Sequence, residues 1–118
     1  MHNKESWRAA LQARRDIVKA EIFSALARID DDRYAALTDQ VHDTKDNAVA
    51  QLMLESDNAE LRRAGVELQD IDAALQRVSA GTYGRCVVCD AQIPASRLAA
   101  YPTAKRCLPC QSRHEQER

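Results

Sequence analysis

Four cysteines are the residues of this sequence with the most distinctive chemistry. They form two C-x-x-C pairs, Cys86/Cys89 and Cys107/Cys110, with 17 residues between the pairs. Two residues between paired cysteines let both thiolates reach one ion at about 2.3 Å, and two such pairs complete a tetrahedron. Because protein ligands then fill all four positions, the spacing predicts one structural Zn²⁺ and not a catalytic metal.

A redox centre is the other common use of C-x-x-C pairs. Thioredoxin-type chemistry needs a βαβ context with the first cysteine at a helix N-terminus, and no strand-like run precedes either pair here. The sequence also shows no activated nucleophile, open metal site or phosphate-binding loop. We therefore predict that the protein is not an enzyme and has no catalytic or cofactor-binding residues beyond the zinc ligands.

Several side chains next to the cysteines bear on such a site. A tetrathiolate zinc centre is negatively charged, so nearby cations stabilise it. The basic residues close in sequence are Arg85, Arg97, Lys105 and Arg106. His114 follows a complete ligand set, and we expect it to be solvated.

The elements that must position the zinc site are long helices. No proline precedes Pro94, and Gly65 is the only glycine before Gly81, so breakers are rare. A seam with alternating spacings of four and three predicts a coiled coil; it consists of Ala50, Leu54, Asp57, Leu61, Ala64, Leu68, Ile71, Leu75 and Val78. A less regular stripe precedes it, made of Trp7, Leu11, Val18, Ile22, Ala25 and Ile29.

Two seams joined by a polar segment predict an antiparallel helical hairpin. The expected fold is mainly α: a long antiparallel coiled-coil hairpin over residues 1–80, with its tip at about 38–47, and a small four-cysteine zinc-finger domain over 81–118 with a short closing helix. Gly81 is expected to end the second helix. Gly65 either costs helix propensity or lets a partner approach closely, and Arg14 occupies a stripe position that favours an apolar residue.

Charge is distributed unevenly along the chain. The net charge is −1, but residues 30–60 hold nine acidic and two basic side chains. Such a block repels phosphate backbones, which argues against direct DNA binding. A zinc module that binds nucleic acid directly stays the alternative, because residues 61–118 hold nine basic and six acidic side chains. No apolar run is long enough for a membrane span and the start lacks a signal-type apolar segment, so a cytoplasmic protein is expected.

The stretch GTYGRCVVCDAQIPASRLAAYPTAKRCLPCQ, residues 81–111, resembles the DksA/TraR C4-type zinc-finger family of bacterial transcription factors. The shared features are the YG before the first cysteine, the IP, the RL, the A-x-P-T-A and the closing C-x-x-C-Q. Upstream, DTKDNA resembles the family's tip motif D-x-x-D-x-A and gives Asp43, Asp46 and Ala48.

The resemblance implies a protein that binds RNA polymerase at the rim of the secondary channel and inserts its hairpin towards the active site. Asp43 and Asp46 would then alter promoter complexes without touching DNA, with Ala48 packed beside them. Arg63 matches a basic position that supports docking, and Arg97 would contribute at the rim. A monomer is expected, acting at ribosomal RNA and other stringently controlled promoters.

The sequence also departs from the family pattern. Where members that respond to ppGpp carry three basic side chains, this chain has Asp70, Tyr101 and Gln111. A carboxylate facing a pyrophosphate is unfavourable, so we expect weak or no ppGpp dependence. Asp90 stands where the family usually has glycine after the first cysteine pair; aspartate tolerates the left-handed conformation better than most residues, so the turn should survive.

Overall fold

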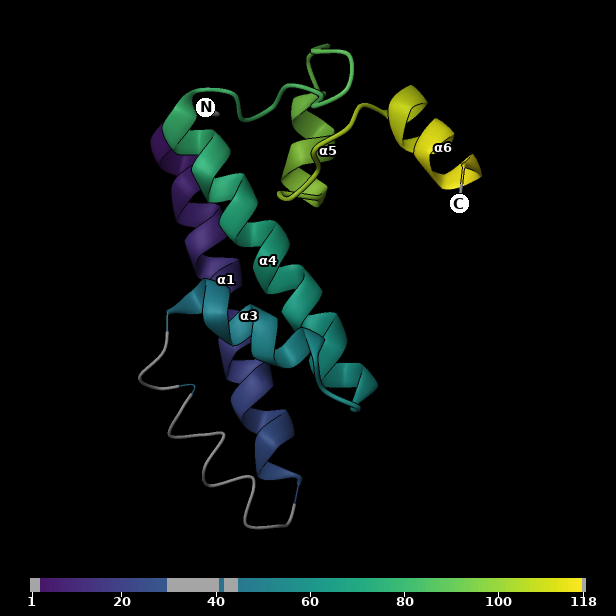
Figure 1. Ribbon diagram of the computed structural model, residues 1–118. Coiled ribbons are helices and arrows are strands. Elements are labelled where there is room, and N and C mark those ends of the chain that lie inside the picture. Colours follow the sequence, from purple (N-terminus) through teal and green to yellow (C-terminus); the bar gives the residue numbers. More distant parts are fainter. Residues whose placement is uncertain (1–2, 30–40, 42–44, 118) are drawn as a thin grey trace. The chain divides into compact units, whose positions relative to one another are not determined.

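The computed structural model describes residues 3–29, 41 and 45–117 of the 118-residue chain (Figure 1). Its helices are α1 (Lys4–Ala27), α3 (Asp46–Leu54), α4 (Ala59–Ala80), α5 (Ala95–Ala100) and α6 (Leu108–Gln116). Within these residues the other regular structure is one isolated β-bridge between Arg85 and Gln92, which confirms the predicted mainly α class. Asp43 and most of the predicted tip lie outside the described residues.

The described helices carry no candidate membrane span. In residues 3–29 and 45–117, none of them combines the length and the apolar character that crossing a bilayer requires.

Two compact units make up the chain, one formed by residues 12–72 and the other by residues 1–11 with 73–118. The predicted domain boundary after residue 80 stays a prediction, since compactness divides the chain at residue 72.

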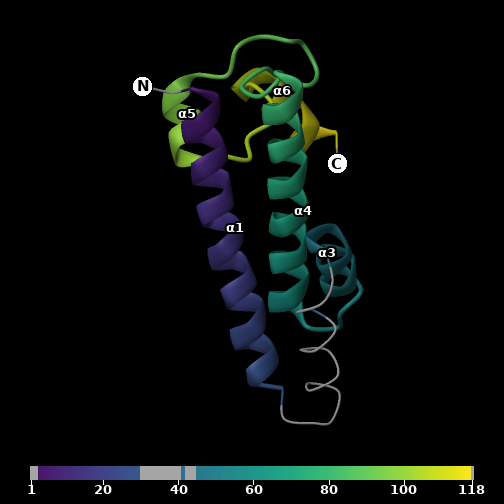
Figure 2. The same cartoon turned by 90° about the vertical axis from the view of Figure 1, so that its left-hand side faces the viewer.

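In the unit of residues 12–72, α1 and α4 lie side by side and run antiparallel (Figure 2). Arg14 of α1 pairs with Glu67 of α4, and Arg28, just after α1, pairs with Glu60 at the start of α4 at 2.6 Å. The residue number on the α4 side falls from 67 to 60 as the number on the α1 side rises from 14 to 28. This is the antiparallel order predicted for the hairpin.

Apolar periodicity explains which faces of these helices are buried. The fully buried side chains of α1 are Leu11, Val18, Ile22, Ala25 and Leu26, and those of α4 are Leu61, Leu68, Ile71, Ala74 and Val78. Most of these residues belong to the two predicted stripes. Arg14 interrupts the first stripe because its guanidinium binds the Glu67 carboxylate, with an Nη2–Oε1 distance of 2.8 Å.

The second arm of the hairpin is interrupted, and the predicted helical continuation of the seam through Asp57 is wrong. Residues 55–58 separate α3 from α4, and Asp57, predicted as a seam position, is exposed there. Asn58 starts α4 by accepting a hydrogen bond from the Leu61 N–H on its side-chain oxygen at 3.1 Å. Asparagine is a strong helix N-cap, so local capping and the packing of α3 outweigh the continuous spacing.

Gly65 explains how α3 packs against α4. A Cβ at this position would lie 2.8 Å from the Met53 Cβ and 2.9 Å from the Ala50 carbonyl oxygen. Both distances are shorter than carbon contacts allow. Of the two readings offered by the sequence, the close approach of a partner is therefore the one confirmed, and the partner is α3.

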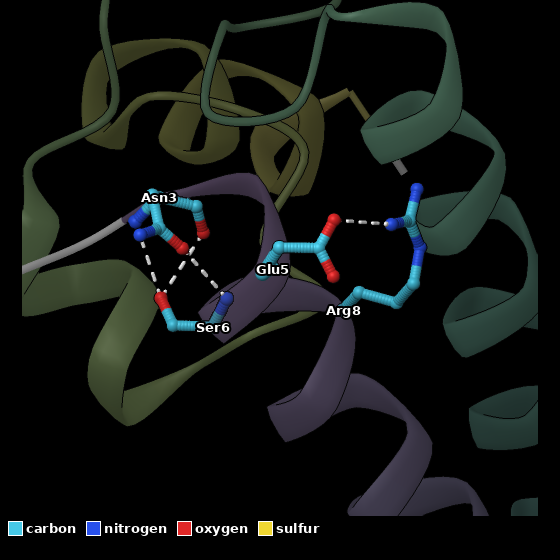
Figure 3. A network of polar contacts seen from close by, with 4 residues as sticks. All are labelled: Asn3, Glu5, Ser6 and Arg8. Atoms are coloured by element: carbon cyan, nitrogen blue, oxygen red, sulfur yellow. Dashed lines mark hydrogen bonds and ion pairs between the residues drawn. The ribbon is translucent and has the colours of Figure 1, made fainter.

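The N-terminus of α1 carries a reciprocal cap (Figure 3). The Asn3 side-chain oxygen accepts the Ser6 N–H at 2.9 Å, and the Ser6 hydroxyl oxygen accepts the Asn3 N–H at 3.1 Å. Two N–H groups that have no partner inside the helix are thereby satisfied. Glu5 and Arg8 form an ion pair at 3.2 Å one turn along the same helix.

At the other end, α4 stops where the sequence predicts. Gly81 adopts φ of 81°, and the Thr82 N–H reaches back to the Arg77 carbonyl oxygen at 2.9 Å. This six-to-one bond with a left-handed glycine is a Schellman motif. It turns the chain out of the helix and into the segment that carries the first cysteine pair.

Candidate metal centre

The four cysteines come together in the unit of residues 1–11 and 73–118. Their sulfur atoms all lie within 4.8 Å of one another. The Cys89 and Cys107 sulfurs, one from each pair, are 3.6 Å apart. Four sulfurs at about 2.3 Å from a central ion lie about 3.8 Å from one another in a regular tetrahedron, so the cluster fits one Zn²⁺.

The first cysteine pair sits in a tight turn. Asp90, directly after Cys89, has φ of 63°, and its N–H donates to the Cys86 carbonyl oxygen at 2.9 Å. The Val88 N–H points to the Cys86 sulfur at 3.4 Å. The left-handed conformation expected at Asp90 is therefore confirmed, and the turn tolerates aspartate in place of glycine.

The second cysteine pair is held by the start of α6. Cys107 is the N-cap residue of this helix, Pro109 occupies its first turn and Cys110 follows inside the helix. Proline is well suited to a first helical turn because no intrahelical partner awaits its missing N–H. The helix start thereby fixes the spacing of the two thiols.

Backbone hydrogen bonds join the two halves of the centre. The Val87 N–H donates to the Lys105 carbonyl oxygen at 2.9 Å. The Cys86 N–H donates to the Ala91 carbonyl oxygen at 2.8 Å. The first bond joins residues 18 apart in sequence and the second closes the turn of the first cysteine pair, so the ligands are positioned by backbone as well as by metal.

The thiols differ in their readiness to lose a proton. Burial raises the pKa of the Cys86 thiol, but backbone N–H groups, including that of Val88, outweigh it and lower this pKa to about 6. A hydrogen bond with Cys107 is the main cause that raises the pKa of the Cys110 thiol to about 12. Four crowded sulfurs share protons in this way until a divalent cation allows all of them to ionise.

Three of the four ligands, Cys86, Cys107 and Cys110, are buried, and Cys89 is exposed. The donor set is thus closed, all-sulfur and largely shielded from water, which is the character of a structural zinc site. His114 lies exposed on α6, as expected of a histidine outside the ligand set.

Two of the basic residues near the centre, Arg85 and Arg97, have partners of their own. Arg85 pairs with the Asp90 carboxylate at 3.3 Å, on the turn that carries the first cysteine pair. The Arg97 guanidinium lies 6.0 Å from the Tyr101 ring centroid, within cation–π range. Tyr101 itself is 63% exposed, so this pair presents an aromatic surface to solvent.

The aromatic anchor of this unit was not anticipated from the sequence. The rings of Trp7 and Tyr83 lie 4.9 Å apart between centroids, and the Tyr83 hydroxyl donates to the Pro102 carbonyl oxygen at 2.7 Å. Trp7 was expected only as the first member of a helical stripe. The YG that precedes Cys86 was the available signal, since a buried tyrosine needs a hydrogen-bond acceptor.

Asp46 and Ala48 of the D-x-x-D-x-A motif lie at the start of α3, in the unit of residues 12–72. Ala48 is exposed. The Asp46 carboxylate is bound by two cations of α1, with Lys19 Nζ at 2.9 Å and Arg15 Nε at 3.5 Å. The sequence did not single out these two basic residues, although their spacing of four places them on one helix face.

The other residues named by the resemblance are spread over both units. Arg63 is exposed on α4, in the unit of residues 12–72, and Asp70 belongs to the same helix and unit. In the other unit, Gln111 of α6 donates to Glu115 at 3.0 Å. None of the three positions replaced in the ppGpp pattern carries a cation.

Comparison with known sequences identifies the metal-binding part. The family model described as the prokaryotic dksA/traR C4-type zinc finger matches residues 81–116. An uncharacterized protein of Aquifex aeolicus (strain VF5) is 42% identical over 50 residues, which cover 42% of this chain and 34% of that protein. An uncharacterized 8.2 kDa protein from the gpA 5′ region of Escherichia phage P2 is 67% identical over 27 residues, covering 23% and 36%. The matches span about a third of the length of these curated relatives.

Comparison with solved structures extends the likeness to nearly the whole chain. The structure of transcription factor DksA2 from Pseudomonas aeruginosa matches with a TM-score of 0.61 and 28% sequence identity, over 97% of this chain and 84% of that one. The zinc-finger match and this structural match agree with the all-cysteine centre described above. The chain is therefore similar to a DksA transcription factor over nearly its whole length, and residues 81–116 match a DksA/TraR C4-type zinc finger whose four cysteines bind a structural Zn²⁺.

Proposed function

We propose that this DksA-like protein regulates transcription by binding RNA polymerase at its secondary channel and directing the segment around Asp43 and Asp46 towards the active site. The observation that carries the proposal is the structural match to a transcription factor over 97% of the chain, together with the zinc finger at residues 81–116. The fold and the finger are those of DksA/TraR-type transcription factors.

The zinc centre supports a docking role in this proposal. A closed four-sulfur site has no position for substrate, so its contribution is to shape a rigid surface and not to catalyse a reaction. Arg97 lies in the same unit on α5, and Arg63 lies on α4. We assign both to contacts with the polymerase, each as a cation on a surface that carries the factor's docking interactions.

The regulated step is initiation at ribosomal RNA and other stringently controlled promoters, with weak or no dependence on ppGpp. The protein acts as a monomer in the cytoplasm. It acts as a regulator and not as an enzyme. Direct DNA binding is not part of the proposal, because the nine acidic side chains of residues 30–60 oppose contact with phosphates.

In vitro transcription from a ribosomal RNA promoter tests the proposal. The variant Asp43→Asn with Asp46→Asn should bind polymerase within about twofold of the unmodified protein, because tip charges contribute little to docking at the rim, and should lose the effect on transcription. A matched control is Asp16→Asn with Glu21→Gln, which removes two exposed carboxylates from α1 and should regulate normally.

Two results would reject the proposal. One is normal regulation by the double tip variant. The other is tight binding to promoter DNA without polymerase, with an affinity that falls steeply as salt rises; that result would favour the alternative of a nucleic-acid-binding zinc module.

A further inference from the structure

Helix α3 is fastened to α1 at its first residue. The Asp46 carboxylate contacts Lys19 Nζ at 2.9 Å and Arg15 Nε at 3.5 Å, and about a quarter of its side chain remains exposed. Two cations on successive turns of α1 thus neutralise the acid. An aspartate in the first turn of a helix is also favoured by the helix dipole, so the charge has partners on both sides.

The body of α3 is fastened to α4 through Gly65. Met53 and Ala50 are buried, and a Cβ at residue 65 would lie 2.8 Å from the Met53 Cβ, 2.9 Å from the Ala50 oxygen and 3.0 Å from the Leu54 nitrogen. Two of these neighbours are backbone atoms that cannot rotate away. Glycine is therefore required for the folded-back position of α3.

The bend between α3 and α4 is built from side-chain caps and not from helix breakers. The Ser56 hydroxyl oxygen accepts the Asn58 N–H at 3.1 Å, and Arg62 donates to the Ser56 carbonyl oxygen at 2.9 Å. The intervening sequence, Glu-Ser-Asp-Asn at 55–58, contains neither proline nor glycine. If residues 55–58 became helical, backbone hydrogen bonds of the helix would replace these side-chain bonds.

The spacing of apolar residues shows a second arrangement for the same segment. The seam through Ala50, Leu54, Asp57 and Leu61 keeps its alternation of four and three across the bend. That register is the one that a single straight helix over residues 46–80 would use. In such a helix, residues 50 and 65 would be separated by about 22 Å along the axis, whereas in the bent form they touch.

We infer that α3 is a latch with two positions. In the described position it folds back on Gly65 and its Asp46 is bound by Lys19 and Arg15; in the other position residues 55–58 become helical, α3 extends α4, and Asp46 is released. This part of the inference rests on the proposed function. The folded-back form is inactive because the Asp46 carboxylate, which would act in the polymerase, is bound by Lys19 and Arg15 of the same chain.

A distance measurement within the second arm tests the latch in the free protein. Spin labels on non-canonical residues at positions 51 and 69, both exposed, avoid the four zinc-binding thiols. A straight helix separates these positions by about 27 Å along its axis, and the bent form gives a clearly shorter distance. The unmodified protein should show mainly the shorter distance.

Two variants should open the latch by different routes. Gly65→Ala adds a methyl group where backbone atoms leave no room and should raise the ratio of open to closed form roughly tenfold or more. Asn58→Ala removes the cap that starts α4, which only the bent form needs, and should raise that ratio roughly fivefold. In both variants the far-ultraviolet helical signal should stay equal or rise, because residues 55–58 join the helix.

Matched controls separate opening from general destabilisation. Asn3→Ala removes the cap of α1, the same chemical change at a distant helix start, and Val66→Ala raises helix propensity at an exposed position of α4. Both should keep the short distance. The inference is overturned if Gly65→Ala retains the short distance, or if it gives a broad distribution with reduced helicity, which means that α3 unfolds and does not extend α4.

The effect of the latch on transcription is tested independently of the distance measurement. Latch-opened variants should affect in vitro transcription at a lower protein concentration than the unmodified chain. If the Asp43→Asn/Asp46→Asn variant regulates normally, the proposed function fails while the distances still decide whether the latch exists. If the distances change as expected but the concentration dependence does not, the latch does not restrain activity and the inactive-form part of the inference is rejected.

Discussion

The Tyr83 hydroxyl donates a hydrogen bond to the Pro102 carbonyl oxygen at 2.7 Å. Tyr83 precedes the first cysteine pair and Pro102 precedes the second, so one bond ties the two halves of the zinc finger together outside the metal. The Tyr83 ring makes a second contact, because it packs with Trp7 at 4.9 Å between centroids. A single tyrosine thereby connects the finger to the first helix.

Tyr83→Phe should lower the free energy of unfolding by about 1 kcal/mol, the usual net value of a hydrogen bond. Urea titrations of the zinc-loaded protein measure this change, and Tyr101→Phe, at a tyrosine that is 63% exposed, is a control of the same chemistry. An unchanged unfolding midpoint in Tyr83→Phe would mean that the bond to Pro102 contributes nothing to stability.

Tyr83 should also make stability depend on alkaline pH. Burial is the main cause that raises the pKa of its phenol above the ordinary value of about 10. Between the unfolded and the folded pKa the folded state binds more protons, so stability is full below about pH 10 and falls as the pH rises through the folded value. Urea titrations at pH 8 and 10.5 should show a steeper loss for the unmodified protein than for Tyr83→Phe; equal losses would contradict the assignment.

Zinc removal should unfold the finger while leaving helical structure elsewhere. The finger has two short helices, α5 and α6, and a small core that includes Ile93 and Leu98, so metal binding supplies much of its folding free energy. We expect one zinc per chain by metal analysis, and loss of amide protection around Ile93 and Leu98 after chelation. Cys107→Ser should bind zinc far more weakly.

His114→Ala is the matched control for the zinc ligands, because this residue is exposed on the helix that carries Cys110. Its zinc content and affinity should equal those of the unmodified chain. A metal-free protein that keeps its amide protection in the finger would show that the centre is not structural.

Arg14 and Glu67 should be coupled by a modest free energy. Their side chains are 40% and 35% exposed, so water screens much of the attraction, and about 0.3–1 kcal/mol is expected. A double-mutant cycle with Arg14→Ala and Glu67→Ala measures the coupling, which should shrink in 1 M salt. Additive effects of the two substitutions would show that the pair contributes no coupling free energy.

The metal ligands and the helical stripes could be predicted because their signals are local. The C-x-x-C spacing is a property of the ligand chemistry, and residues such as Val18, Ile22 and Leu68 repeat at the helical period, so burial follows from position. The left-handed backbone at Gly81 and Asp90 could also be predicted, since each residue type tolerates this conformation and stands at an expected turn.

The fold-back of α3 could not be predicted because its cause is not local. The seam continues through residues 55–58, and only the contact of Gly65 with Met53 and Ala50, twelve or more residues away, reveals the bend. The cap formers Ser56 and Asn58 were a hint, but such side chains also occur within helices. Asp46 was expected at a free tip, and its contacts with Lys19 and Arg15 depend on that bend.

The response to ppGpp should be weak and should increase when cations are restored. Tyr101 is 63% exposed and Gln111 is partly exposed, so lysine fits at both positions without burial of its charge. Each added cation near a phosphate contributes about 0.5–1 kcal/mol at an exposed site. The variant Tyr101→Lys with Gln111→Lys should therefore gain a several-fold ppGpp effect in transcription assays, while the unmodified protein changes less than about twofold.

Leu108→Lys, another exposed position of the same unit, adds a charge outside the three matched positions and should gain nothing. Strong stimulation of the unmodified protein, or an equal gain in the Leu108 control, would show that these positions do not govern the nucleotide response.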